Sequence, residues 1–233
     1  MTRVLAVSDE TDDCLLADAG RFRGVELIVA CGDLPFDYLR YLIDGLDVPL
    51  MFVPGNHDPD VSGYRHSRAG LTMQGAMPVR PPWPPGATNV DGVVTEQCGL
   101  RIAGLGGSLR YREGPNQYTQ RRQTARAFRL ALRAGWPRRT GVDLLLTHAP
   151  PRGCGDGPDL PHRGFDALHP LIHRLHPQFL LHGHIHPYGS DAPDRRVGDT
   201  VVRNVVGHHI LDVAPRRGVY TGPCVPSHRV PEG

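Results

Sequence analysis

Short apolar runs alternate with amphipathic segments over the first quarter of the chain. Residues 3–8 form a short apolar and β-branched run, and residues 25–30 and 49–53 are also mainly apolar, which is typical of buried strands. Phe36–Leu46 carries apolar residues at helical spacing, and residues 14–19 indicate a helical turn. Strands that alternate with helices in this way predict an α/β fold with a largely parallel sheet.

The middle of the chain changes character. Five prolines within residues 77–86 lead us to expect no regular structure there. A helix is expected over residues 117–134, with an apolar stripe of Ala125, Phe128 and Leu132. Between these segments, a small meander of strands is predicted at residues 88–90, 93–96 and 100–105.

The last third returns to strands and loops. The segment 150–164 is rich in glycine and proline, which predicts a loop. The other elements expected there are a helix at residues 165–175 and strands at 142–146, 179–181, 200–206 and 210–213. Because no repeat or linker is evident, we expect one domain over residues 1–214 and a C-terminal tail at 215–233.

Bulk composition is that of a globular chain, with 39% apolar and 21% charged residues among 233. No run approaches the ~20 apolar residues that a membrane span needs, and the first residues lack a signal-peptide pattern. Five widely spaced cysteines without a Cys-x-x-Cys pair predict reduced thiols in a cytoplasm. All 26 basic residues are arginine, but a net charge of +2 gives no argument for a nucleic-acid partner.

Side chains that can bind metals stand directly after the expected strands. They are found in the segments Asp9, Gly32-Asp33, Gly55-Asn56-His57-Asp58, Thr147-His148 and Gly183-His184-Ile185-His186. Open α/β sheets bind ligands at the carboxyl ends of their strands, so these residues are expected to lie together. Carboxylates, imidazoles and an amide suit a two-metal site, in which cations ~3.5–4 Å apart clamp a phosphate and lower the pKa of a bound water.

The spacing of these residues suggests which of them bind metal and which face the substrate. Asp33 is the natural bridging carboxylate, because the glycine before it lets the backbone approach the metals. His184 and His186 are two residues apart, so in extended backbone they project to the same side. Neighbours in such backbone point opposite ways, so Asn56 can bind metal while His57 faces the substrate.

The ordered set resembles the calcineurin-like metallophosphoesterase family, whose members have two packed mixed β-sheets flanked by helices. The resemblance implies that metal one is held by Asp9, Asp33 and His186, and metal two by Asp33, Asn56, His148 and His184. His57 would be the general acid near the leaving group, steadied by Asp58. The implied reaction is hydrolysis of a phosphoester small molecule by in-line attack of a metal-bridging hydroxide.

Two strings, residues 107–118 and 150–165, are similar to small cyclic-nucleotide phosphodiesterases of this family. We therefore expect a phosphodiester, with a cyclic nucleotide as one candidate, ahead of a phosphomonoester. Arg110 or Arg112 would clamp the phosphate, Tyr111 would stack on a base, and Asn116 would add a hydrogen bond. The alternative interpretation of this segment is a polar loop with one packed tyrosine.

One position departs from the family pattern, because Thr11 stands where a histidine is expected two residues after Asp9. Glu10, Asp12 or Asp13 can supply an oxygen ligand instead, with Asp12 the first choice. The alternative is that the segment Thr11-Asp12-Asp13 only caps the next helix. An oxygen-rich first site favours harder ions such as Mn²⁺ or Mg²⁺ over Zn²⁺. Two divalent cations are expected as cofactors, with Mn²⁺ the first choice and Fe, Zn²⁺ or Mg²⁺ the other options. The rival function is a binding scaffold that has lost catalysis.

Two further sets of residues can be interpreted either as functional or as purely structural. His162, in the loop after the Thr147-His148 motif, either enters the site or has no chemical role, and the second is favoured. Four arginines fall along one face of the expected helix at 117–134, namely Arg122, Arg126, Arg129 and Arg133. A solvated helix face is favoured there over a surface for RNA backbone.

Overall fold

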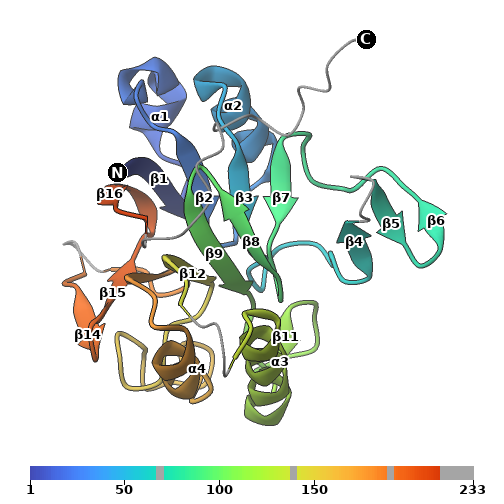
Figure 1. The fold of residues 1–233 in the computed structure, drawn as a ribbon, viewed down its shortest axis with the longest axis vertical. Helices are drawn as coiled ribbons and strands as arrows, with labels where there is room; N and C mark the ends of the chain where they lie inside the picture. Colours follow the sequence, from blue (N-terminus) through green and yellow to red (C-terminus); the bar gives the residue numbers. More distant parts are fainter. Residues whose placement is uncertain (67–70, 137–140, 188–191, 216–233) are drawn as a thin grey trace.

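The computed structural model in Figure 1 describes residues 1–66, 71–136, 141–187 and 192–215. Its first sheet contains, in spatial order, β16 (Gly207–Val213), β1 (Thr2–Ser8), β2 (Leu27–Ala30), β3 (Leu50–Phe52) and β7 (Ala87–Asn89). Strands β1, β2, β3 and β7 are parallel, and β16 joins β1 in antiparallel register. The three apolar runs at the start of the sequence thus form the middle of this sheet.

The second sheet is also mixed. Its spatial order is β14 (Arg195–Val197), β15 (Thr200–Asn204), β13 (Phe179–His182), β12 (Leu144–Thr147), β9 (Leu100–Leu105) and β8 (Val94–Gln97). The four central strands are parallel, whereas β14 and β8 are antiparallel edge strands.

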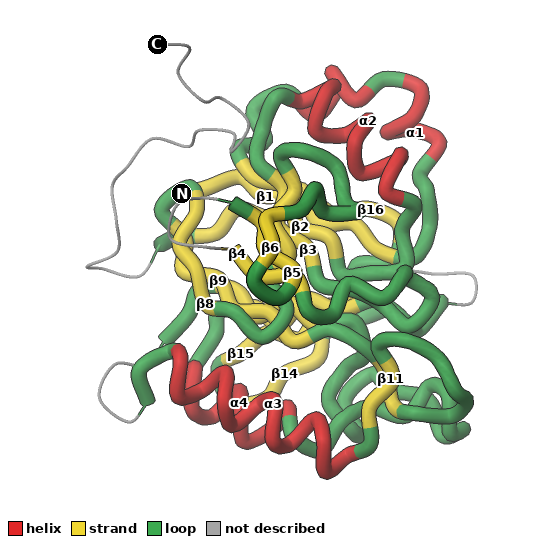
Figure 2. Tube along the Cα trace, turned by 90° about the vertical axis from the view of Figure 1, so that its right-hand side faces the viewer, coloured by secondary structure: helices red, strands yellow, loops and turns green. Residues whose placement is uncertain are grey.

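The two sheets pack face to face between two layers of helices. Alternate side chains of β1 show this, because Val4 and Ala6 join Leu144 of the second sheet in one buried cluster. Leu5 and Val7 face the other way, beneath α1 (Asp13–Ala17), η1 (Ala19–Phe22) and α2 (Phe36–Leu46). The helices α3 (Gln120–Arg133) and α4 (Leu168–Leu175) cover the second sheet, at the opposite end of the stack (Figure 2). The expected α/β fold with two packed mixed sheets is confirmed.

Two expectations for the middle of the chain were wrong. Strands β8 and β9 do form a hairpin, but β7 belongs to the first sheet, where it pairs in parallel with β3. A three-residue strand of mixed polarity, Ala87–Asn89, carries no information about which sheet it joins. Regular structure also enters the proline-rich segment, because β6 (Met77–Pro78) pairs with β5 (Thr72–Gln74) at the edge of a small sheet that includes β4 (Tyr64–His66). A proline is tolerated on such an edge strand.

Helix α3 turns a different face to the core from the one expected. Phe128 and Leu132 are 45% and 47% exposed, whereas Ala127, Leu130 and Ala131 are buried. Small alanines let the helix approach the sheet closely. Arg126 also points inward, since its guanidinium binds the Asp91 carboxylate at 2.6 Å and the Gly106 carbonyl at 3.0 Å. The arginine face is therefore not wholly solvated.

Cysteine usage also differs from the expectation of five reduced thiols. Cys98 is disulfide-bonded, whereas Cys14, Cys31 and Cys154 are free. Sequence spacing does not reveal such a pairing. Among the described helices, none has the length and apolar character of a membrane span. The expected tail falls almost entirely outside the described residues, so the domain boundary at residue 214 stays a prediction.

Candidate metal centre

The carboxyl ends of strands from both sheets meet at one place. Asp9 and Asp33 follow β1 and β2, and His148 and His184 follow β12 and β13. Two of the contacts that join the sheets there involve these side chains. The His184 backbone N–H donates to Asp9 Oδ2 at 2.9 Å, and His148 Nε2 lies 3.2 Å from Asp33 Oδ2. Residues expected as ligands from the sequence are thus gathered across the seam between the sheets.

The backbone around this seam adopts an uncommon conformation. Asp9, Asp33 and His184 have φ angles of 60°, 57° and 66°, in the left-handed region. For residues with a Cβ atom this costs about 1–3 kcal/mol each, and such strain concentrates at functional sites. The glycines here are equally constrained, since a Cβ on Gly55 would lie 2.1 Å from Asp33 Oδ1. A Cβ on Gly183 would lie 2.0 Å from Asp9 Oδ2.

The more buried half of the centre is built from Asp33, Asn56, His148 and His184. Ligand atoms of Asp33, His148 and His184 lie within 4.8 Å of one another. His148 Nδ1 lies 2.8 Å from the Cys31 carbonyl oxygen, which can only accept, so Nδ1 carries a proton. His148 Nε2 then faces two oxygens, Asp33 Oδ2 at 3.2 Å and Asn56 Oδ1 at 3.0 Å.

Electrostatics in this half favour positive charge at its centre. Burial alone would lower the pKa of His148, but the hydrogen bond and charge of Asp33 raise it to about 9. Burial acts to raise the pKa of Asp33, yet the His148 ring and the His57 backbone N–H hold it below its usual value. Burial and the charge on His148 lower the pKa of His184 to about 3, so that ring is neutral. This donor set fits a divalent cation.

The other half of the centre is more exposed. Asp9 Oδ2 accepts hydrogen bonds from the Ser8 hydroxyl at 2.5 Å and from the His184 backbone, and Asp9 Oδ1 lies 3.9 Å from His186 Nε2. His186 Nδ1 lies 2.9 Å from Glu10 Oε1. A carboxylate accepts, so His186 presents the lone pair of Nε2 toward Asp9.

Asp12, the first choice to replace the missing histidine, is occupied elsewhere. Its Oδ1 accepts from the backbone N–H groups of Cys14 and Leu15, which caps α1. Its Oδ2 lies 2.7 Å from His208 Nδ1. The helix-cap interpretation therefore describes Asp12, because both carboxylate oxygens are already engaged.

A second group of polar side chains lies beside the ligands. His57 is exposed, and its Nδ1 lies 3.3 Å from Arg112 Nη2. The Asn56 amide nitrogen donates to the Tyr111 hydroxyl at 3.3 Å, which turns the Asn56 carbonyl oxygen toward His148. Arg112, which the sequence offered only as an alternative to Arg110, is thus the arginine that reaches His57.

Two predicted site residues make structural contacts. Asp58 Oδ2 accepts from the backbone N–H groups of Asp33 and Gly55, at 2.9 and 2.7 Å, and so ties two ligand loops together. The Asn116 amide donates to the carbonyl oxygens of Asp58 and Pro59. Asn116 is buried, whereas Arg110 is exposed at the end of β10 (Ser108–Leu109), which pairs with β11 (Gln117–Tyr118). Roles of Asp58 toward His57, and of Asn116 and Arg110 toward substrate, stay predictions.

The loop that follows His148 folds back over the centre. His184 Nε2 donates to the Pro161 carbonyl at 2.8 Å, which leaves Nδ1 for a metal. The His162 ring lies 5.6 Å from the His184 ring, and His162 Nδ1 is 2.7 Å from Asp159 Oδ2. His162 therefore lies near the centre, although the sequence favoured a loop residue without a chemical role.

The arrangement agrees with the comparison to known families. A model of the calcineurin-like phosphoesterase family matches residues 9–188, which includes every candidate ligand. The chain belongs to this family. The search of curated proteins gave no match.

Solved structures of similar fold are distant in sequence. One crystal structure superposes with a TM-score of 0.59 and 16% identity, covering 90% of this chain and 94% of its own. The protein TT1561 of Thermus thermophilus gives a TM-score of 0.52 and 18% identity, with 88% and 89% coverage. These likenesses support the calcineurin-like fold and nothing finer.

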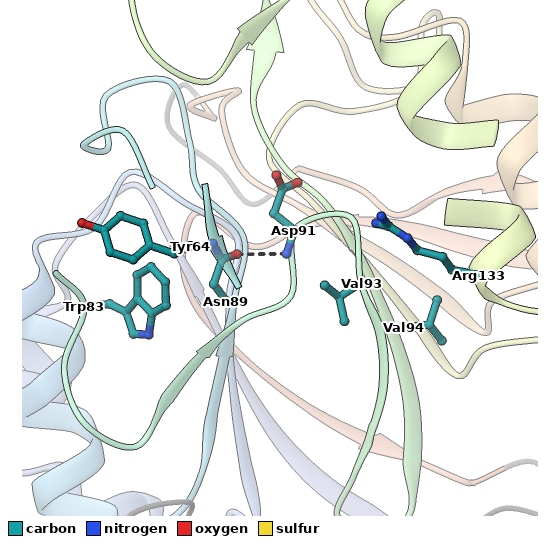
Figure 3. A pocket seen from close by; sticks show the side chains of 7 residues that line it. All are labelled: Tyr64, Trp83, Asn89, Asp91, Val93, Val94 and Arg133. Atoms are coloured by element: carbon teal, nitrogen blue, oxygen red, sulfur yellow. Dashed lines mark hydrogen bonds between the residues drawn. The ribbon is translucent and has the colours of Figure 1, made fainter. Parts of the chain in front are cut away.

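A separate cavity of about 500 Å³ is lined by residues outside the candidate ligand set (Figure 3). Tyr64 and Trp83 form one wall and Arg133 another. Two of its polar side chains are already engaged, because Asn89 accepts from the Asp91 backbone N–H and the Asp91 carboxylate binds Arg126 of α3. None of its lining residues is a candidate ligand.

Proposed function

We propose that this chain is a metal-dependent phosphoester hydrolase that uses two divalent cations, with Mn²⁺ the first choice. The observation that carries the proposal is the His148 ring. Its Nδ1 is fixed on a backbone carbonyl, while its Nε2 faces two oxygen acceptors, Asp33 Oδ2 and Asn56 Oδ1. A proton on Nε2 satisfies these oxygens in the metal-free chain, and a divalent cation that displaces this proton would meet three donor atoms at once.

The residues divide into two sets of ligands. Asp9, Asp33 and His186 would hold the first cation, and Asp33, Asn56, His148 and His184 the second. Bound cations would neutralise the phosphoryl oxygens and supply a water of lowered pKa. Asp33 belongs to both sets, and its Oδ1 also accepts the His57 backbone N–H at 2.8 Å, which fixes the loop that carries His57.

His57 is proposed as the group that delivers a proton to the leaving oxygen. A guanidinium can only donate, so Arg112 requires His57 Nδ1 to be an acceptor. The ring proton then resides on His57 Nε2, where it is available to a substrate oxygen. Arg112 and Tyr111 stand beside the same ligands, which suits a substrate with a second substituent on phosphorus. We therefore favour a phosphodiester, with cyclic nucleotides as candidates, over a monoester.

The test is hydrolysis of bis(p-nitrophenyl) phosphate and p-nitrophenyl phosphate with Mn²⁺ between pH 6 and 9. Asp33→Asn should lose bound metal and activity together, whereas Asp37→Asn, an exposed carboxylate on α2, should keep both. His57→Ala should lower kcat about 10²- to 10⁴-fold and retain metal. His173→Ala, an exposed histidine on α4, is its control.

Absence of turnover on both esters, in a chain that holds two cations, would favour the non-catalytic scaffold. Loss of metal in His57→Ala would show that His57 is a ligand and not the proton donor. A panel of 2′,3′- and 3′,5′-cyclic nucleotides then tests the substrate class.

A further inference from the structure

The three candidate histidine ligands are oriented by different kinds of oxygen. His148 donates to the Cys31 carbonyl and His184 to the Pro161 carbonyl, both of which are parts of the main chain. His186 alone is oriented by a side chain, through the 2.9 Å contact from Nδ1 to Glu10 Oε1. Partners of this kind fix the ring of a metal-binding histidine and raise its basicity.

We propose that Glu10 is a positioning residue for the first metal and offsets the absence of a histidine at Thr11. The inference rests on the proposed function. Glu10 holds the His186 ring so that Nε2 faces Asp9 Oδ1, 3.9 Å away. Both side chains are at least half exposed, at 58% for Glu10 and 50% for His186, so packing alone does not fix the ring.

Neighbouring acidic residues do not provide this contact. Asp12 uses both of its carboxylate oxygens on the cap of α1 and on His208. Asp13 is exposed in the first turn of α1. Glu10 follows Asp9 directly, and of these three acidic side chains it is the one that contacts a candidate ligand.

A consequence is that the two metal positions have unequal affinity. The second draws on His148 and His184, which are 0% and 7% exposed and oriented by main-chain carbonyls. The first draws on an exposed ring held by one flexible carboxylate. We therefore expect the metal-free chain to bind Mn²⁺ in two steps, a tight step at the second position and a weak step at the first. Glu10 should affect the dissociation constant of the weak step alone.

The experiment is a titration of the metal-stripped full chain with Mn²⁺. Binding is measured by calorimetry and, independently, by the EPR signal of free Mn²⁺. Glu10→Ala should weaken the weak step about 10- to 100-fold and leave the tight step unchanged. Glu10→Gln should stay within about threefold of the native chain, because its amide oxygen still accepts the Nδ1 proton. Asp13→Ala removes the same charge three residues away and should change neither step.

Each contrary result has a distinct meaning. Unchanged binding in Glu10→Ala, or an equal loss in both steps, overturns the positioning role. A loss in Glu10→Gln as large as in Glu10→Ala also overturns it, since Glu10 would then act through its charge as a ligand. A native chain that binds no Mn²⁺ at all refutes the proposed function itself, which the first two results leave intact.

Discussion

Gly32 and Gly24 offer a matched test of how tightly the candidate metal centre is packed. Both have nearly the same positive φ, 94° and 95°, so an alanine at either position meets similar backbone strain of about 1–2 kcal/mol. Their surroundings differ. A Cβ on Gly24 would meet nothing within 4 Å, whereas one on Gly32 would lie 2.4 Å from Gly55 N and 2.9 Å from His148 Nδ1.

The expected losses of stability follow from this contrast. Gly24→Ala should cost about 1–2 kcal/mol from strain alone. Gly32→Ala adds the displacement of backbone at Gly55, and overpacking of this kind costs about 1–3 kcal/mol more. The sum for Gly32→Ala is therefore about 2–5 kcal/mol. For a chain of this length each kcal/mol lowers the melting temperature by about 2–4 °C.

The assay is urea unfolding of both variants, with the Mn²⁺ titration as a second measurement. Only Gly32→Ala should weaken Mn²⁺ binding, because only its Cβ presses on the His148 ring and on the loop of Gly55. Equal losses of stability in the two variants, with unchanged metal affinity, would refute the claim that the ligand loops are in van der Waals contact here.

Three further outcomes are expected. Asp12→Ala should cost about 1 kcal/mol in urea unfolding, since it removes a helix cap, and should leave both Mn²⁺ affinities unchanged; a loss of metal would make Asp12 a ligand after all. Arg126→Met should lower the free energy of unfolding by about 2–4 kcal/mol, because it removes the arginine partner of the largely buried Asp91 carboxylate. Arg129→Met, at an exposed position, should change it by no more than about 0.5 kcal/mol. Burial lowers the pKa of His182 to about 4, so its neutral form stabilises the fold fully above pH ~6.5 and this contribution is lost as the pH falls toward 4. Between pH 7 and 5 the native chain should lose about 2 kcal/mol more than His182→Asn, and parallel pH profiles would contradict this.

The sequence was most informative where a strand ends in a polar motif. Apolar runs predicted the bounds of β1, β2, β3, β12 and β13 to within two residues. Because these strands are parallel within each sheet, the motifs that follow them were expected at the carboxyl edge of a sheet. The fold class followed from the same pattern, with the family resemblance supplying the second sheet. Periodicity failed at α3, because its buried face uses alanines and leaves Phe128 and Leu132 half exposed. Hydrophobicity alone ranks those two large residues above alanine.

Other features lay beyond what the order of side chains can specify. The carbonyl groups of Cys31 and Pro161 set the orientation of two histidines, and every residue type has a carbonyl. Their part depends on the path of the loops, which sequence does not specify. Glu10 was one of three acidic candidates, and only the packing around α1 separates it from Asp12. Arg112 and Arg110 differ in the same way, since one turn of the loop decides which reaches His57.

The place of β1 in the first sheet has a consequence for biosynthesis. β1 lies between β2 and β16, and β16 ends at Val213. During translation, one edge of β1 therefore stays unpaired until Val213 has left the ribosome. Candidate ligands from Asp9 to His186 are likewise assembled late, because long-range pairings form only after the intervening chain exists. Nascent chains should thus acquire cations only after His186 has emerged, and truncation before β16 should leave an open strand prone to aggregation.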